Sequence, residues 1–205
     1  MAPLYRRILS LARDRGKLNR VPTKVSPRAD RAGLTVNVSF VAAASNAVYI
    51  TIDDIDSFSA AKRKAAPLGA TREELIKNAF ARVAGDCGKF KDWGGEKSDL
   101  YTNKHRVRGS RRPVAIAFKG RGTKGRLVPA KMGANGDQID RLFDETAEAF
   151  LIVYCGQIAS SIVSQMKAFA IAKKALAGQR AYFGVIDADD LGRIAAGYPN
   201  QFRRT

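Results

Sequence analysis

Cysteine and histidine are scarce in this chain, which limits the chemistry it can support. There are two cysteines and one histidine. Cys87 and Cys155 form no Cys-x-x-Cys pair, and His105 is the sole imidazole. The sequence therefore favours neither a zinc site nor a disulfide framework. We predict a protein of the reducing cytoplasm.

Long apolar runs are also lacking. The longest uncharged stretch covers residues 149–166, but glycine, glutamine and serine interrupt it. That composition favours a buried strand followed by a helix over a membrane span. The chain has 205 residues, which suits one compact domain with an arm. We expect no membrane partner.

Acidic residues are few, nineteen against thirty-six lysines and arginines, so the net charge is +17. Nine cations lie between Arg6 and Arg31. None of the acids lies between Asp99 and Asp137, where ten cations occur: Lys104, Arg106, Arg108, Arg111, Arg112, Lys119, Arg121, Lys124, Arg126 and Lys131. A solvated charged face is one interpretation. Contact with a phosphate backbone is the other, and we expect nucleic acid, in the first place DNA, as the partner.

The apolar patterns predict an α/β fold with a basic N-terminal region. Residues 1–65 would form a basic arm and a β-hairpin, with strands at 34–40 and 47–52, packed on a core over 66–205. The core begins with a helix over 72–84, opened by a capping box of Thr71 and Glu74. Strands are expected near 89–93, 98–102, 113–119, 150–154 and 182–186, with helices near 137–147 and over 157–177. This order is typical of an α/β domain.

The strand at 113–119 combines a lysine with an unexpected alanine. Ala117 and Lys119 share one face of the strand, because side chains alternate with period two. Asp99, on the neighbouring strand, could bind Mg²⁺ while Lys119 orients an attacking water. One carboxylate rarely holds Mg²⁺ alone, so the second acid is expected at position 117, where the chain has a methyl group.

These residues resemble the PD-(D/E)xK nucleases, the restriction-endonuclease-like family, over about residues 71–202. In that family a helix precedes three strands, with an Asp on the second strand and D/E-x-K on the third. The matching residues here are Asp99 and, eighteen residues later, Ala117-Phe118-Lys119. The resemblance implies a central mixed sheet flanked by helices, with Mg²⁺ or Mn²⁺ held by Asp99 and residue 117. An acid from the preceding helix sometimes completes the metal shell, which makes Glu74 a candidate.

The alanine at 117 leaves three interpretations. We interpret the chain as the inactive Glu→Ala form of a metal-dependent DNA endonuclease that still binds nucleic acid. Alternatively, its lineage lost cleavage, or never had it, and the protein is a nucleic-acid-binding or scaffold subunit. Under either interpretation the protein could be a homodimer or a subunit of a larger assembly. An RNase H-like nuclease that uses Asp187, Asp189 and Asp190 is the third, although these acids also suit a helix start.

Several other side chains are weaker candidates. Gln138 and Gln165 could order the site or a phosphate. His105, inside the cationic segment, is expected to be exposed or to contact phosphate, and Trp93 and Tyr101 flank the proposed site and could stack on a base. The Gly-x-Gly-x-x-Gly at 120–125 follows a strand, but no helix is expected after it, so a dinucleotide site is not favoured.

Overall fold

A computed structural model of the chain describes residues 21–30, 33–41, 47–86, 97–177 and 180–203. Its centre is a five-stranded sheet in the order β3-β9-β8-β7-β4. The strands are β3 (Ala47–Tyr49), β4 (Leu100–Thr102), β7 (Val114–Lys119), β8 (Ala149–Tyr154) and β9 (Ala181–Ile186). The first four in the sheet order are parallel and β4 runs antiparallel to β7. The predicted α/β fold with a mixed sheet is confirmed.

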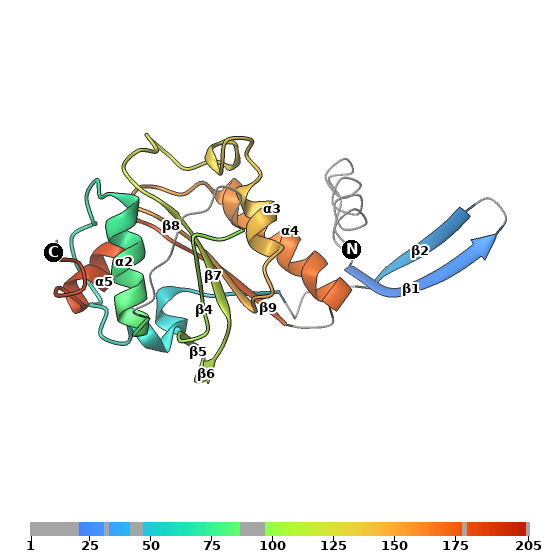
Figure 1. Ribbon diagram of the computed structural model, residues 1–205, viewed down its shortest axis with the longest axis horizontal. Coiled ribbons are helices and arrows are strands. Elements are labelled where there is room, and N and C mark those ends of the chain that lie inside the picture. The colour runs from blue at the N-terminus through green and yellow to red at the C-terminus, as the bar shows by residue number, and fades with distance from the viewer. Residues whose placement is uncertain (1–20, 31–32, 42–46, 87–96, 178–179, 204–205) are drawn as a thin grey trace.

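Helices cover both faces of this sheet (Figure 1). Helices α2 (Glu73–Ala84) and α5 (Ala188–Gly197) pack on one face, and α3 (Gln138–Phe143) and α4 (Ser160–Ala177) on the other. The short 3-10 helices are η1 (Ile52–Asp54), η2 (Asp56–Phe58) and η3 (Pro129–Lys131). Two small antiparallel pairs lie outside the sheet: β1 (Val21–Asp30) with β2 (Gly33–Val41), and β5 (Arg106–Val107) with β6 (Ser110–Arg111).

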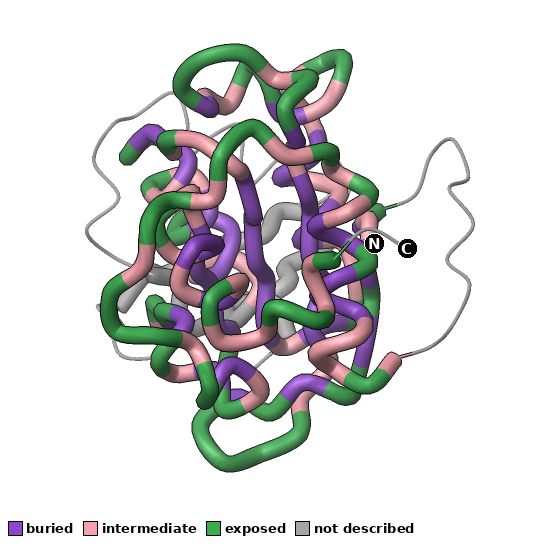
Figure 2. The backbone as a smooth tube through the Cα atoms, turned by 90° about the vertical axis from the view of Figure 1, so that its left-hand side faces the viewer, coloured by how far each residue is buried: buried purple, intermediate pink, exposed green. Residues whose placement is uncertain are grey.

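Strand β7 lies inside the sheet and is buried on both faces, as its run of apolar residues indicates. Val114, Ile116 and Phe118 belong to the apolar layer under α2 and α5. Ala115 and Ala117 belong to the layer under α3 and α4. In Figure 2, buried segments of the backbone, in purple, run through the middle of the molecule.

Helix α2 forms where the spacing of Ile76, Phe80 and Val83 predicts it and ends at Gly85, which has φ +70°. The predicted capping box is wrong. Arg72 occupies the N-cap without a side-chain cap, because the Thr71 hydroxyl donates to the Gly69 carbonyl instead.

The predicted hairpin is also wrong. Strand β2 pairs with β1, and β3 pairs in parallel with β9 at the edge of the central sheet. Ile50, Ile52, Ile55 and Phe58 are buried in the layer under α2 and α5. The core therefore includes residues 47–65, which were predicted to belong with the arm.

The other predicted elements of the core are confirmed with shifted ends. Helix α3 is shorter than expected and stops at Phe143, and α4 begins at Ser160. The strand expected near 89–93 and residues 1–20 of the arm lie outside the described residues. Within the described part of the chain, no helix combines the length and the apolar character that crossing a membrane requires.

Candidate functional site

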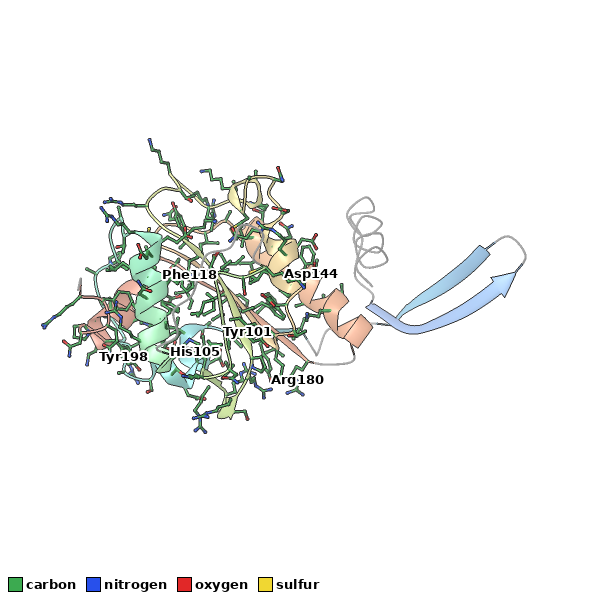
Figure 3. The ribbon with its side chains drawn as sticks, in the orientation of Figure 1. Tyr101, His105, Phe118, Asp144, Arg180 and Tyr198 are labelled. Atoms are coloured by element: carbon green, nitrogen blue, oxygen red, sulfur yellow. The ribbon has the colours of Figure 1, made fainter. Side chains whose placement is uncertain are left out.

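The carboxylate of Asp99 is fixed against the strand that carries Lys119. Asp99 directly precedes β4, and its amide donates to the Ile116 carbonyl at 3.0 Å. Its Oδ2 atom accepts from the Phe118 amide at 2.6 Å and from Nε2 of Gln138 at 3.2 Å. Figure 3 labels Phe118 near the middle of the molecule, between α2 and α3. The main chain of β7 and the first residue of α3 therefore set the position of this acid.

Asp99, Ala117 and Lys119 occupy the same side of the sheet. Gln138 belongs to α3, so the Asp99 carboxylate that it contacts lies on the α3 side. Ala117 is packed in the apolar layer on that side, and alternation along β7 directs Lys119 the same way. Asp99 and Lys119, the two residues of the predicted motif that the chain retains, therefore lie on one side of the sheet. The register of β4 with β7, continued by one residue, places Ala117 opposite Asp99.

Glu73 supplies a further acid to this cluster from the first turn of α2. Its Oε2 atom accepts from the Gly120 amide at 3.3 Å. Burial raises the pKa of Glu73, and the charge of Asp99 raises it further, while Lys119, the Gly120 amide and Lys77 act in the opposite direction. Glu73 therefore lies within electrostatic range of both signature residues.

Glu74, the acid that the resemblance nominates, has a different position. It is exposed and lines a hollow on the outer side of α2. Of the two adjacent acids, the structure places Glu73 and not Glu74 beside the loop that follows Lys119. The helical phase contains a usable signal, because Glu73 shares a face with the buried Ile76, Lys77 and Phe80, at spacings of three, four and seven residues.

The start of α2 and the loop after β7 are in close contact. The Arg121 amide donates to the Thr71 carbonyl at 2.8 Å. At Gly120 a Cβ atom would lie 2.3 Å from the Glu73 nitrogen, closer than any non-bonded contact allows. Only glycine fits at this position without moving the helix, so the close approach of Glu73 depends on it.

A second set of bonds orders the loop that continues from Gly120. The Tyr154 hydroxyl lies 2.8 Å from the Thr123 carbonyl and 2.6 Å from the Gly125 carbonyl. The Lys131 ammonium donates to the carbonyls of Lys124 and Arg126 at 2.6 and 3.0 Å. With these carbonyls held, the side chains of Arg121, Lys124 and Arg126 are exposed to solvent.

Gln138 has an unmet bonding requirement at the site. The residue is 6% exposed, and within the described residues its Oε1 atom has no hydrogen-bond partner. A buried amide oxygen of this kind requires a water, an ion or a ligand group. It is a suitable oxygen ligand for Mg²⁺, beside the carboxylate of Asp99.

The donor set nevertheless falls short of a Mg²⁺ site. Among the residues that the structure describes, no group of three or more His, Cys, Asp or Glu side chains is arranged to hold a metal. One oxygen of Asp99 already accepts from the Phe118 amide, and burial raises the pKa of Glu73. Ala117 contributes a fully buried methyl group. The residues of this chain as it stands do not fit a resident Mg²⁺ ion.

The ten cations of residues 104–131 do not form one surface. Strand β7 separates them, so Lys119 and the loop residues lie at its carboxyl end and the β5–β6 group near its start. In the second group, ion pairs join Lys104 to Asp86, Arg108 to Asp54 and Arg112 to Glu148. Arg106 and Arg111 are exposed. The mutual repulsion expected from the sequence is relieved by this separation and pairing.

His105 is not in an exposed loop. It is 1% exposed and packs against the Phe58 ring at 5.4 Å between centroids. Burial lowers the pKa of His105 to about 4. The expectation of phosphate contact or exposure is therefore wrong, because the residues preceding β5 enter the core beside η2.

The remaining aromatic and amide candidates have mixed outcomes. Tyr101 is 40% exposed on the edge strand β4, with its hydroxyl 3.4 Å from the Thr146 carbonyl. Trp93 lies outside the described residues. Gln165 is half-buried in α4, and no bond connects it to Asp99 or Gln138 within the described residues.

The acids after β9 have a structural function. The Asp187 carboxylate accepts from the amides of Asp189 and Asp190 at 3.0 and 3.1 Å and so caps α5. Arg193 joins Asp190 to Asp53 by ion pairs of 3.2 and 2.7 Å. This geometry agrees with the capping interpretation and gives no support to an RNase H-like metal cluster.

The chain matches no protein-family model, no curated protein and no solved structure. The resemblance to PD-(D/E)xK nucleases therefore rests on Asp99, Ala117 and Lys119 and on their positions in the structure.

Proposed function

We propose that the protein binds DNA at the carboxyl end of β7, through a PD-(D/E)xK-type site that lacks one carboxylate. The observation that carries the proposal is the position of Asp99, whose carboxylate accepts from the Phe118 amide one residue before Lys119. An acid that directly precedes β4 and the lysine that ends the adjacent strand β7 thus lie on one side of a mixed sheet. Glu73 and Gln138 complete the polar surroundings.

The residues around this site suit a phosphodiester backbone. Lys119 and the exposed Arg121, Lys124 and Arg126 present positive charge at the strand end. Phosphate contacts of this type supply most of the affinity of proteins for nucleic acid and make it dependent on salt. We expect binding of duplex DNA that weakens steeply as salt is raised.

Cleavage is not expected of the chain as it stands, because residue 117 supplies no oxygen ligand. A Mg²⁺ ion in a site of this type activates water and neutralises charge on the phosphate. A glutamate at 117 would add a carboxylate on the same face as Lys119. In the chain with alanine at 117, Asp99 and Gln138 are already held by hydrogen bonds, and Lys119 ends the same strand as residue 117.

The decisive test is Ala117→Glu. We expect this variant to cleave DNA with Mg²⁺ or Mn²⁺, while the unmodified chain binds without cutting. Asp99→Asn and Lys119→Ala, each introduced into the Ala117→Glu protein, are expected to abolish cleavage. Binding by fluorescence anisotropy should persist in all four proteins.

A thermal melt gives a second readout that does not require activity. Position 117 is fully buried among apolar side chains, so an unpaired glutamate there destabilises the fold. Mg²⁺ at 100 times its dissociation constant would restore roughly 2.7 kcal/mol. The unmodified chain should show no such response. An Ala117→Glu protein that folds and binds DNA, but neither cuts nor responds to Mg²⁺, would refute the nuclease-type site.

That last outcome would favour a protein that binds nucleic acid without any cleavage chemistry. One observation supports this second candidate. The Ala117 methyl group is 0% exposed and packs with Leu127, Met132 and Ile139 in a closed apolar layer. A lineage that had long since lost cleavage would fill the position in this way.

A further inference from the structure

A hollow of about 320 Å³ lies on the outer side of α2, next to the candidate site. Its lining combines three arginines with three other polar side chains: Arg72, Arg82, Arg121, Thr71, Asn78 and Glu74. Asn78 and Arg82 follow Glu74 along α2 at intervals of four residues, so they project from one face of the helix. Arg121 reaches the hollow from the loop after β7.

The three guanidinium groups are uncommitted. Within the described residues, no hydrogen bond or ion pair engages the side chain of Arg72, Arg82 or Arg121. Other arginines are paired, since Arg108, Arg112 and Arg193 each contact a carboxylate. Three arginines around one concavity repel one another unless an anion joins them. With a single carboxylate opposing them, the lining is net positive.

Backbone hydrogen bonds connect the lining of the hollow to the candidate site. Arg121 follows Gly120, whose amide bonds to Glu73, and the Arg121 amide bonds to the Thr71 carbonyl. Arg72 and Glu74 flank Glu73 on either side. A strand that crosses the end of β7 at Lys119 would therefore reach these arginines with a neighbouring phosphate.

We propose that this hollow binds a backbone phosphate of the DNA strand that occupies the candidate site. The inference rests on the proposed function, because it names a second contact of the same substrate. Arg72, Arg82 and Arg121 hold the phosphate, since planar guanidinium groups suit its oxygens. Asn78 offers an amide donor, and Glu74 opposes the phosphate charge.

The test is the salt dependence of duplex binding by the full chain. Fluorescence anisotropy measures it on a labelled DNA of about 20 base pairs, a length chosen to span the hollow and the candidate site. Arg72→Gln, Arg82→Gln and Arg121→Gln should each weaken binding several-fold in 50 mM salt, and each should reduce the slope of log K against log salt by about 0.9. Arg82→Lys should weaken binding but keep the slope, because the charge remains. Glu74→Gln should strengthen binding.

Arg180→Gln is the matched control. Arg180 is exposed and precedes β9, which runs parallel to β8 and β7, so it lies at the opposite end of the sheet; Figure 3 labels it at the lower edge of the domain. Its removal costs the same charge and should leave the slope unchanged. Circular dichroism and melting temperature confirm that each variant is folded.

Three results would overturn the proposal: slopes that the hollow variants leave unchanged, a slope that falls equally in Arg180→Gln, or failure of the full chain to bind the duplex in low salt. Competition distinguishes a backbone phosphate from a free one. Inorganic phosphate or a mononucleotide that displaces the duplex at an equal phosphate concentration would also contradict it. The slope and competition results are independent of cleavage by Ala117→Glu, so the hollow can fail while the nuclease-type site stands. Failure of the full chain to bind the duplex would refute both.

Discussion

Replacing Gly120 by alanine would separate the two elements that form the candidate site. The new methyl group would lie 2.3 Å from the nitrogen of Glu73 and 2.8 Å from its Cα and Cβ atoms. Non-bonded carbon contacts require about 3.5 Å, so the start of α2 must retreat by roughly 1 Å. The clash involves main chain, and no side-chain rotation relieves it. We expect the cost of overpacking, about 1–3 kcal/mol, at the upper end of that range.

Gly122→Ala is the control within the same loop. A methyl group there would meet nothing within 4 Å, and Gly122 is not among the glycines with positive φ. Alanine at such a position is neutral or stabilises by about 0.4–1 kcal/mol through the unfolded state. For a protein of this size each kcal/mol moves the melting temperature by about 2–4 °C. The two variants should therefore differ by about 5–16 °C in a thermal melt.

The substitution of Gly120 should change DNA binding as well as stability. When α2 retreats, the 3.3 Å bond from the Gly120 amide to Glu73 lengthens or breaks, and DNA binding in low salt should weaken for Gly120→Ala alone. Melting temperatures of Gly120→Ala and Gly122→Ala that agree within a degree would refute the close approach of loop and helix, and with it the assignment of Glu73 to the cluster.

Two further predictions concern titratable groups. His105 takes up a proton near pH 6.5 in the unfolded chain but only near pH 4 in the fold. The free energy of unfolding therefore falls by roughly 3 kcal/mol as the pH drops from 6.5 to 4. Below pH 4, His105 causes no further loss. His105→Leu should remove this loss in urea titrations at pH 7 and pH 4.5, and an unchanged difference between the two pH values would contradict the burial of the ring. Asp99→Asn should lower the pKa of Glu73 by removing a nearby negative charge, and Lys119→Gln should raise it. Carboxyl carbon NMR titration measures both, and shifts of equal sign would show that Glu73 does not sense the two residues together.

The central strands could be predicted because burial on both faces leaves an unbroken apolar run. Residues 114–118 and 149–154 are buried throughout, which is the pattern of interior strands in a parallel sheet. The placement of Ala117 and Lys119 on one face of β7 could be predicted from the sequence for a related reason. A period of two along β7 fixes which residues share the face of Lys119, whatever covers that face.

Other features depend on partners that are distant in the sequence. The strand at 47–49 pairs with β9, more than a hundred residues away, and local alternation alone cannot distinguish that from a hairpin with its neighbour. The capping box is absent because the Thr71 hydroxyl donates to the nearby Gly69 carbonyl, and the distant Arg121 amide engages the Thr71 carbonyl. The cation cluster is contiguous in sequence but divided in space by the length of β7.

The way in which Asp99 is held determines what a change at residue 117 can do. Its carboxylate is fixed by the Phe118 main-chain amide and by Gln138, and the side chain of Ala117 contributes no hydrogen bond. Replacing that side chain therefore leaves the anchor of the acid in place. Lys119, at the end of the strand, keeps its direction for the same reason. A site built in this way can gain or lose a carboxylate at 117 without losing Lys119 or the exposed cations of the following loop, so the proposed function predicts that one residue separates binding from cleavage.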